Sequence, residues 1–270
     1  MAEHYGKLKI TGDLVFNASA IDTIITAGAP GSEAHAKTRA YVQDALQKAG
    51  WQVEVQEFTY RGKTIRNITG TRGDQAAGPV LIGAHYDTRP VADRDPQVRS
   101  EPIIGGNDGA SGVAVLLELA RVLPPDLATP VQLAFFDAED LGDLNGWPFS
   151  VGATHLAQSL TVSPTAVIVL DMIGDADLQI YQEGNSDPQL TKQIWDVAGR
   201  LGYSDAFIPR RKWTMIDDHI PFRQRGFAAL DLIDFDYPYW HTRQDTCDKI
   251  SAESMEKVGR VIQEWMTNGQ

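Results

Sequence analysis

The chain has 270 residues, of which 43% are hydrophobic and 22% are charged, and these values are typical of a globular protein. Its formal net charge of −12 argues against nucleic-acid binding. No apolar run approaches the ~18 residues needed to cross a bilayer, so we expect neither a nucleic acid nor a membrane as a partner. No linker divides the sequence, and we therefore expect one domain over residues 1–270.

The N-terminal sequence, MAEHYGKLKI, has no apolar core followed by a small-residue cleavage site. We therefore expect no signal peptide in this form, although a signal removed beforehand stays open. A single cysteine, Cys247, excludes an internal disulfide and is compatible with a reducing compartment such as the cytoplasm. The sequence assigns neither the location nor the oligomeric state.

Hydrophobic periodicity predicts strands and helices in alternation along the first half of the chain. Ser32 is expected to cap the first helix and Gly50 to end it, with His35 at the surface of its first turn. In chain order, we expect an apolar segment at 14–16, a helix over 33–49, a β-hairpin of 51–60 with 63–71, a buried strand over 80–84 and a helix over 113–123.

The same alternation continues to the C-terminus. Ser251 is expected to cap the last helix. In chain order, we expect a strand over 131–136, a helix over 150–158, strands over 166–170 and 178–181, a helix over 188–201, a strand over 227–233 and a helix over 252–265. This pattern predicts an α/β fold with a largely parallel central sheet covered by helices on both faces.

Polar side chains gather where the expected strands end, which is where α/β proteins build their sites. One His and three acids follow three of these strands, another acid lies in a glycine-rich turn before a helix, and a second His lies in an aromatic loop. In chain order, these residues are His85, Asp108, Glu139, Asp140, Asp171 and His241. Because buried carboxylates need a compensating charge, the set favours a metal site over separate helix caps and ion pairs.

Two His and three carboxylates suit Zn²⁺, and a shared carboxylate can bridge two ions ~3.5–4 Å apart. Glu139 is adjacent to Asp140 in the sequence, so it can face such a site without binding the metal. That is the position of a general base.

Six ordered motifs, HYD, NDGASG, FFDAED, VLDMIG, DDHIPF and WHT, resemble the zinc aminopeptidases of peptidase family M28 and their relatives, the animal-type glutaminyl-peptide cyclotransferases (glutaminyl cyclases). The resemblance extends from the turn at 30–32 to the last helix. It implies a phosphorylase/hydrolase-like α/β fold with a central mixed sheet.

The two branches imply different metal sites. Similarity to the aminopeptidases implies two zinc ions and Glu139 as base, with Asp108 as the bridging ligand among His85, Asp108, Asp140, Asp171 and His241. Similarity to the cyclases implies one zinc ion held by Asp108, Asp140 and His241. In that case His85 is not a ligand, and Asp171 belongs to a hydrogen-bond network around the base.

Several residues bear on the choice of branch. Asp217 matches a cyclase residue that holds the substrate and shares a proton network with the base. Trp240 and Trp147 resemble tryptophans that line the cyclase glutamine pocket, although the loop spacing of Trp147 differs and either ring can instead pack in the core or anchor a loop. The residues expected to contact substrate are Trp240, Trp147, Ile216 and Tyr237.

Other positions depart from the cyclases. Asp140 stands where vertebrate cyclases have Glu, Ile216 replaces a glutamine and Asp231 replaces a histidine. The sequence therefore predicts a zinc enzyme that acts on peptide N-termini, with Glu139, Asp217 and Asp171 as catalytic residues. We expect a glutaminyl cyclase that forms pyroglutamate and releases ammonia; the alternatives are a dizinc aminopeptidase and a non-catalytic binding homologue.

Overall fold

The computed structural model describes residues 30–268 and Gly28. The expectations for the N-terminal sequence and for the apolar segment at 14–16 concern residues outside this part. Among the described residues, no helix combines the length and apolar character required to traverse a bilayer.

The central sheet has six strands in the order β1-β2-β4-β3-β5-β8. The first two, β1 (Gln52–Tyr60) and β2 (Lys63–Arg72), form the expected hairpin, and β2 pairs antiparallel with β4. The other four strands run parallel to one another: β3 (Val80–His85), β4 (Val131–Phe136), β5 (Ala166–Asp171) and β8 (Ala229–Ile233). The mixed, mostly parallel sheet is therefore confirmed.

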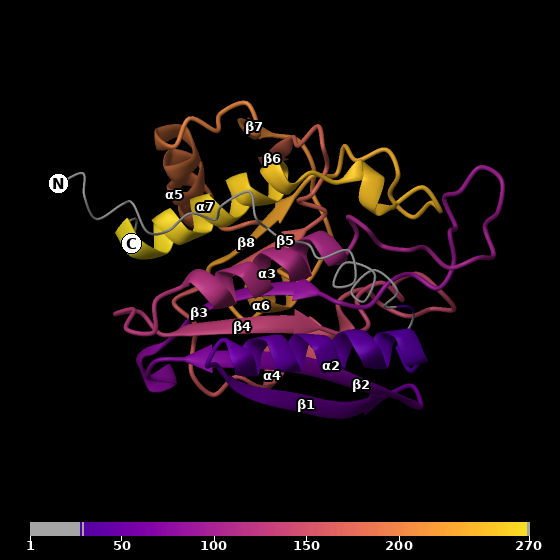
Figure 1. Ribbon diagram of the computed structural model, residues 1–270, viewed down its shortest axis with the longest axis horizontal. Coiled ribbons are helices and arrows are strands. Elements are labelled where there is room, and N and C mark those ends of the chain that lie inside the picture. The colour runs from indigo at the N-terminus through magenta and orange to yellow at the C-terminus, as the bar shows by residue number, and fades with distance from the viewer. Residues whose placement is uncertain (1–27, 29, 269–270) are drawn as a thin grey trace.

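Helices cover both faces of this sheet (Figure 1). One face carries α2 (Glu33–Lys48), α3 (Ala110–Val122), α5 (Pro188–Arg200) and α7 (Ala252–Asn268). The other face carries α4 (Val151–Ser159) and α6 (Ile220–Gln224). Side chains alternate between the faces of a strand, so Ile82 packs into the first layer and Leu81 into the second. A strand buried on both faces reads as a continuous apolar run.

Two elements were not expected from the sequence. The strand β7 (Phe207–Arg211) pairs with β6 (Ile180–Gln182) in a small second sheet, and only Phe207 of β7 is buried. The helix α6 has only five residues. Neither is long enough or apolar enough to give a periodic signal. Residues 30–268 also contain two short 3₁₀ turns, η2 (Gln75–Ala77) and η3 (Cys247–Lys249).

The expectation that His35 lies at the surface is wrong. Ser32 caps α2 as expected, but the His35 side chain is only 1% exposed. Its Nε2 lies 2.9 Å from Asp137 Oδ1, and its ring stacks on Tyr86 with centroids 4.7 Å apart. The contact between His35 and Asp137 connects the first turn of α2 to the residue that follows β4. A local sequence pattern cannot show a partner so distant along the chain.

Candidate metal centre

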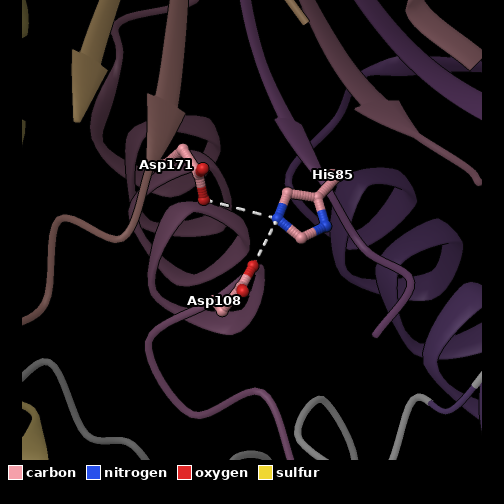
Figure 2. Close-up of side chains that lie close together, drawn as sticks. All are labelled: His85, Asp108 and Asp171. Carbon is pink, nitrogen blue, oxygen red and sulfur yellow. Dashed lines mark hydrogen bonds and ion pairs between the residues drawn. The ribbon is translucent and has the colours of Figure 1, made fainter. Parts of the chain in front are cut away.

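The parallel strands β3, β4 and β5 deliver polar side chains to one edge of the sheet. His85 ends β3 and Asp171 ends β5, while Asp108 lies in the turn before α3. His85 Nε2 is 3.1 Å from Asp108 Oδ1 and 3.3 Å from Asp171 Oδ1. Figure 2 shows the imidazole pointing between the two carboxylates. These three residues form a first group that can hold a metal ion.

A second group shares Asp108 with the first. His241 Nε2 lies 3.1 Å from Asp140 Oδ1 and 3.6 Å from Asp108 Oδ2. Within each group, one ligand atom per residue lies within 4.8 Å of the others, and every member is buried. The structure thus brings together all five residues expected to bind metal, with Asp108 in the position of a bridge.

The donor atoms of the second group fit a divalent cation. Both carboxylate oxygens of Asp140 and Oδ2 of Asp108 are buried without a hydrogen-bond partner. Buried polar atoms are rarely left unpaired in folded proteins. Carboxylate oxygen and imidazole nitrogen are ligands that Zn²⁺ accepts. These oxygens make no hydrogen bond, although His241 Nε2 lies 3.1 Å from Asp140 Oδ1, and they therefore match an ion bound between Asp108, Asp140 and His241.

Proton affinities at the site reflect the crowding of acids. Burial, followed by the neighbouring charge of Asp108, raises the pKa of Asp140 to about 6. Burial, followed by the charge of Asp217, raises the pKa of Asp171 to about 8. Burial opposes a charged His85, but its contacts with Asp108 and Asp171 outweigh burial and raise its pKa well above the ordinary value. A metal ion would have to displace these protons.

Glu139 lies beside the metal-binding groups but belongs to neither. It is only 7% exposed. Burial is the main cause that raises its pKa well above the ordinary value, and the charges of Asp217 and Asp140 add to it. A buried carboxyl with a raised pKa can take up and return a proton, which is what the predicted general base must do.

The Asp108 turn is held by backbone and side-chain hydrogen bonds. The N-cap of α3 is Gly109, so the Asp108 side chain does not cap the helix. Asn107 Oδ1 accepts from the Gly174 N–H at 2.7 Å, and Asp245 accepts from the N–H groups of Asn107 and Asp108 at 2.7 and 3.2 Å. The turn is thereby tied both to the end of β5 and to the C-terminal loop.

Three residues at the site have backbones in the left-handed region although none is glycine. Ala138 (φ 61°) precedes Glu139, Met172 (φ 46°) follows Asp171, and His241 itself has φ 55°. Each such residue costs of order 1–3 kcal/mol and persists only where its surroundings impose it. Sharp backbone turns at these positions therefore direct the side chains of Asp171, Glu139 and His241 toward the same end of the sheet.

The family model for peptidase family M28 matches residues 67–266. The chain belongs to peptidase family M28.

A glutaminyl cyclase from Tannerella forsythia of known structure is 31% identical, with a TM-score of 0.85, and the match covers 94% of this chain and 97% of that one. A Zn-dependent exopeptidase from Parabacteroides distasonis is 28% identical, with a TM-score of 0.86, over 93% and 96% of the two chains. The glutaminyl-peptide cyclotransferase of Drosophila melanogaster is 28% identical over 90% of this chain and 77% of its own.

Of the aromatic residues expected to contact substrate in this M28 protein, Trp240 lies beside the centre. Its half-buried ring stacks on His241 with centroids 3.9 Å apart. Trp147 instead packs edge-on against Tyr60 at 5.1 Å, within a small apolar cluster that includes Ile65. Trp147 thus occupies the loop-anchoring position that the sequence left open.

The other two expected contacts differ in exposure. Ile216 is 71% exposed and directly precedes Asp217, whose side chain is buried. Tyr237 is only 3% exposed, and its hydroxyl donates to Asp245 Oδ1 at 2.8 Å. Because Asp245 holds the backbone of Asp108, Tyr237 helps to hold the turn that carries this candidate ligand, and its contact with substrate stays a prediction.

Further buried acids surround Asp217. Asp218 and Asp231 are 0% exposed, and burial together with the charge of Asp217 raises the pKa of both well above the ordinary value. His219 lies 3.2 Å from Glu183 Oε2 through Nε2 and 3.5 Å from Asp231 Oδ2 through Nδ1. The buried imidazole thus fixes the segment that carries Asp217.

Asp87 is a supporting residue that the sequence analysis missed. Its two carboxylate oxygens accept the backbone N–H groups of Glu139 and Asp140, each at 3.1 Å. Its carbonyl oxygen lies 3.1 Å from His85 Nδ1. A carbonyl can only accept, so Nδ1 carries a proton, and Nε2 faces Asp108 and Asp171 on the side of the site. The available signal was its place two residues after His85.

We expect Asp87→Ala to weaken zinc binding and activity about 10- to 100-fold, as is usual when a residue that orients metal ligands is removed. The loss of an acceptor for two buried N–H groups should also cost about 1–3 kcal/mol of stability. Thermal unfolding and metal analysis of the purified variant measure both effects. Asp87→Asn keeps one acceptor oxygen, so its zinc affinity and melting temperature should lie between those of the wild type and Asp87→Ala. A normal zinc content and melting temperature in Asp87→Ala would contradict the assigned role.

Proposed function

We propose that this protein is a zinc-dependent glutaminyl cyclase, which converts the N-terminal glutamine of a peptide to pyroglutamate and releases ammonia. The observation that carries the proposal is the set of buried ligand atoms on Asp108 and Asp140, which make no hydrogen bond and face His241 beside the buried Glu139. The similarity to the Tannerella forsythia glutaminyl cyclase over 94% of this chain supports it.

The residues can perform this reaction as follows. Asp108, Asp140 and His241 would hold a zinc ion, which would supply a Lewis acid for the γ-amide carbonyl of the substrate glutamine. Glu139 accepts a proton from the attacking α-amine and returns one to the departing ammonia. A bond forms from the α-nitrogen to the carbonyl carbon (Cδ) of the side-chain amide, and the bond from that carbon to the amide nitrogen breaks, so no further reactant is consumed.

Two neighbours assist Glu139 in this proposal. Asp217 is buried and is one of the acids that raise the pKa of Glu139, and in this proposal its carboxylate holds the substrate α-amine. Trp240 stacks on His241 and contacts Phe235 edge-on at 4.9 Å. Such aromatic cover excludes water, and water that displaced the amine would give glutamate instead of pyroglutamate.

A second candidate function is that of a dizinc aminopeptidase. The group His85, Asp108 and Asp171 favours it, because these residues present ligand atoms for a second ion and share Asp108 with the first group. The Zn-dependent exopeptidase from Parabacteroides distasonis is similar over 93% of this chain. In this function Glu139 would act as base toward a water molecule.

One incubation separates the candidates. Zinc-loaded protein is mixed with the peptides Gln-Ala-Ala and Leu-Ala-Ala, and the products are read by mass spectrometry while zinc per chain is counted. We expect the first peptide to lose ammonia, the second to stay intact and the protein to hold one zinc ion. Release of free leucine with two ions per chain would establish the aminopeptidase. No change in either peptide would favour a non-catalytic binding protein.

A further inference from the structure

Arg89 is a buried cation that contacts the loop of one predicted zinc ligand. It is 2% exposed, and its Nη1 donates to the carbonyl oxygens of Asp140 and Gly142 at 3.1 and 2.9 Å. The same Nη1 lies 3.6 Å from Asp140 Oδ1. The guanidinium therefore holds the backbone of Asp140 and places positive charge near its carboxylate.

The other edge of the guanidinium binds Asp93. Nε and Nη2 of Arg89 donate to the two carboxylate oxygens of Asp93 at 2.7 and 2.9 Å, a paired geometry that fixes the carboxylate in orientation as well as position. Asp93 Oδ1 in turn lies 3.3 Å from His241 Nδ1, on the side of the ring opposite Nε2. One arginine thus connects the loops of two predicted ligands.

The segment 89–95 contacts the His241 loop at two further points. The Arg94 N–H donates to the His241 carbonyl at 3.1 Å, and Asp95 Oδ2 accepts from the Arg243 N–H at 3.1 Å. In Figure 1 this segment follows β3, and both loops lie at the same end of the sheet. His241 has a left-handed backbone, which is unfavourable for a residue other than glycine. These two hydrogen bonds hold the loop on either side of it.

From this geometry we infer that Arg89 and Asp93 are positioning residues that set His241 and Asp140 for zinc binding, although neither touches zinc or substrate. A metal-binding histidine commonly presents its second ring N–H to a carboxylate, which fixes the ring and increases its basicity. Asp93 is placed to be that carboxylate, and Arg89 holds it there. The inference rests on the zinc centre of the proposed function.

The test measures zinc affinity by competition with a chromophoric chelator, using purified full-length protein. We expect Asp93→Ala to bind zinc about 10- to 100-fold more weakly, in the range found when such carboxylates are removed. Asp93→Asn keeps an acceptor oxygen and should recover part of the loss. Arg89→Lys keeps the charge but not the paired geometry, and should also weaken binding.

Glu101→Gln is the matched control. Glu101 belongs to the same loop and pairs with Arg243 at 3.0 Å, but both side chains are about half exposed, so solvent screens this ion pair and it contributes little. This variant should bind zinc as the wild type does. A second measurement, the visible spectrum of the cobalt-substituted protein, should shift in Asp93→Asn and not in Glu101→Gln, because only the former changes the surroundings of a ligand.

The inference is overturned, and the proposed function is not, if zinc affinity stays at the wild-type value in Asp93→Ala, Asp93→Asn and Arg89→Lys. An Asp108→Asn variant that loses zinc in the same assay shows that the assay detects a lost ligand. Absence of zinc binding by the wild type would overturn the proposed function together with the inference. If Asp93→Ala does not fold, Asp93→Asn and Arg89→Lys carry the test, since asparagine keeps the size of aspartate and lysine keeps the positive charge of arginine.

Discussion

Replacing Glu139 by glutamine is expected to reduce kcat by a factor of about 10²–10⁴, the usual contribution of a positioned general base. Glutamine keeps the size of the side chain but cannot accept a proton from the substrate amine. Glu139 belongs to neither metal-binding group, so the variant should keep its zinc. Removing a buried acid whose pKa is raised well above normal should also leave the fold intact or more stable. Steady-state kinetics with Gln-Ala-Ala and metal analysis measure the two effects.

Asp143→Asn is a matched control for this change. Asp143 is exposed, lies in the loop that follows Asp140, and has a left-handed backbone that asparagine tolerates. It loses the same charge, so its kcat should stay near that of the wild type. Near-normal turnover by Glu139→Gln would show that another group takes the proton, whereas loss of zinc together with activity would show that Glu139 is a ligand.

The strand ends were the part of the site that the sequence could predict. A strand buried on both faces is a continuous apolar run, and the polar residue that ends it, such as His85 or Asp171, stands out. Parallel strands place such residues along one edge of the sheet. The central elements were therefore found close to their observed bounds, and the five predicted ligands do meet.

The supporting residues could not be predicted in the same way. Asp87 acts by accepting backbone N–H groups, and every residue except proline offers such a group, so no residue type marks the partner. Arg89 and Asp93 look like an ordinary helix-spaced ion pair in an expected loop. Their role depends on His241, which lies far along the chain. The prediction that His35 lies at the surface was wrong for the same reason, because its partner Asp137 is distant in sequence.

The aromatic residues that the sequence placed near the site make different kinds of contact in the structure. Tyr237, Trp240 and Trp147 all flank predicted site residues in the sequence, yet only Trp240 stacks on a predicted ligand. Tyr237 uses its hydroxyl to hold Asp245, and Trp147 packs against the hairpin β1–β2. An aromatic ring fills a core, an anchor or a pocket equally well, and the choice depends on the three-dimensional surroundings.

Removing zinc is expected to abolish activity and to change how stability depends on pH. In the metal-free protein the pKa of Asp140 is raised to about 6 and that of Asp171 to about 8, from an ordinary value of 3.8. The folded state thus binds more protons than the unfolded state between about pH 4 and pH 8, and its stability must fall as pH rises through that window. His85 acts in the same direction, since its pKa is also raised.

Zinc should reverse this trend, because it binds the ionised carboxylates and gains affinity as they lose their protons. At a free concentration about 100-fold above its Kd, the ion adds about 2.7 kcal/mol to stability. Thermal unfolding of the chelator-treated protein from pH 5 to pH 8 should therefore show a falling melting temperature, and re-addition of zinc at pH 8 should raise it and restore turnover. A flat metal-free profile that zinc does not move would mean that the buried acids at the strand ends are neutralised by the protein alone, and that Asp108, Asp140 and His241 do not form a metal centre.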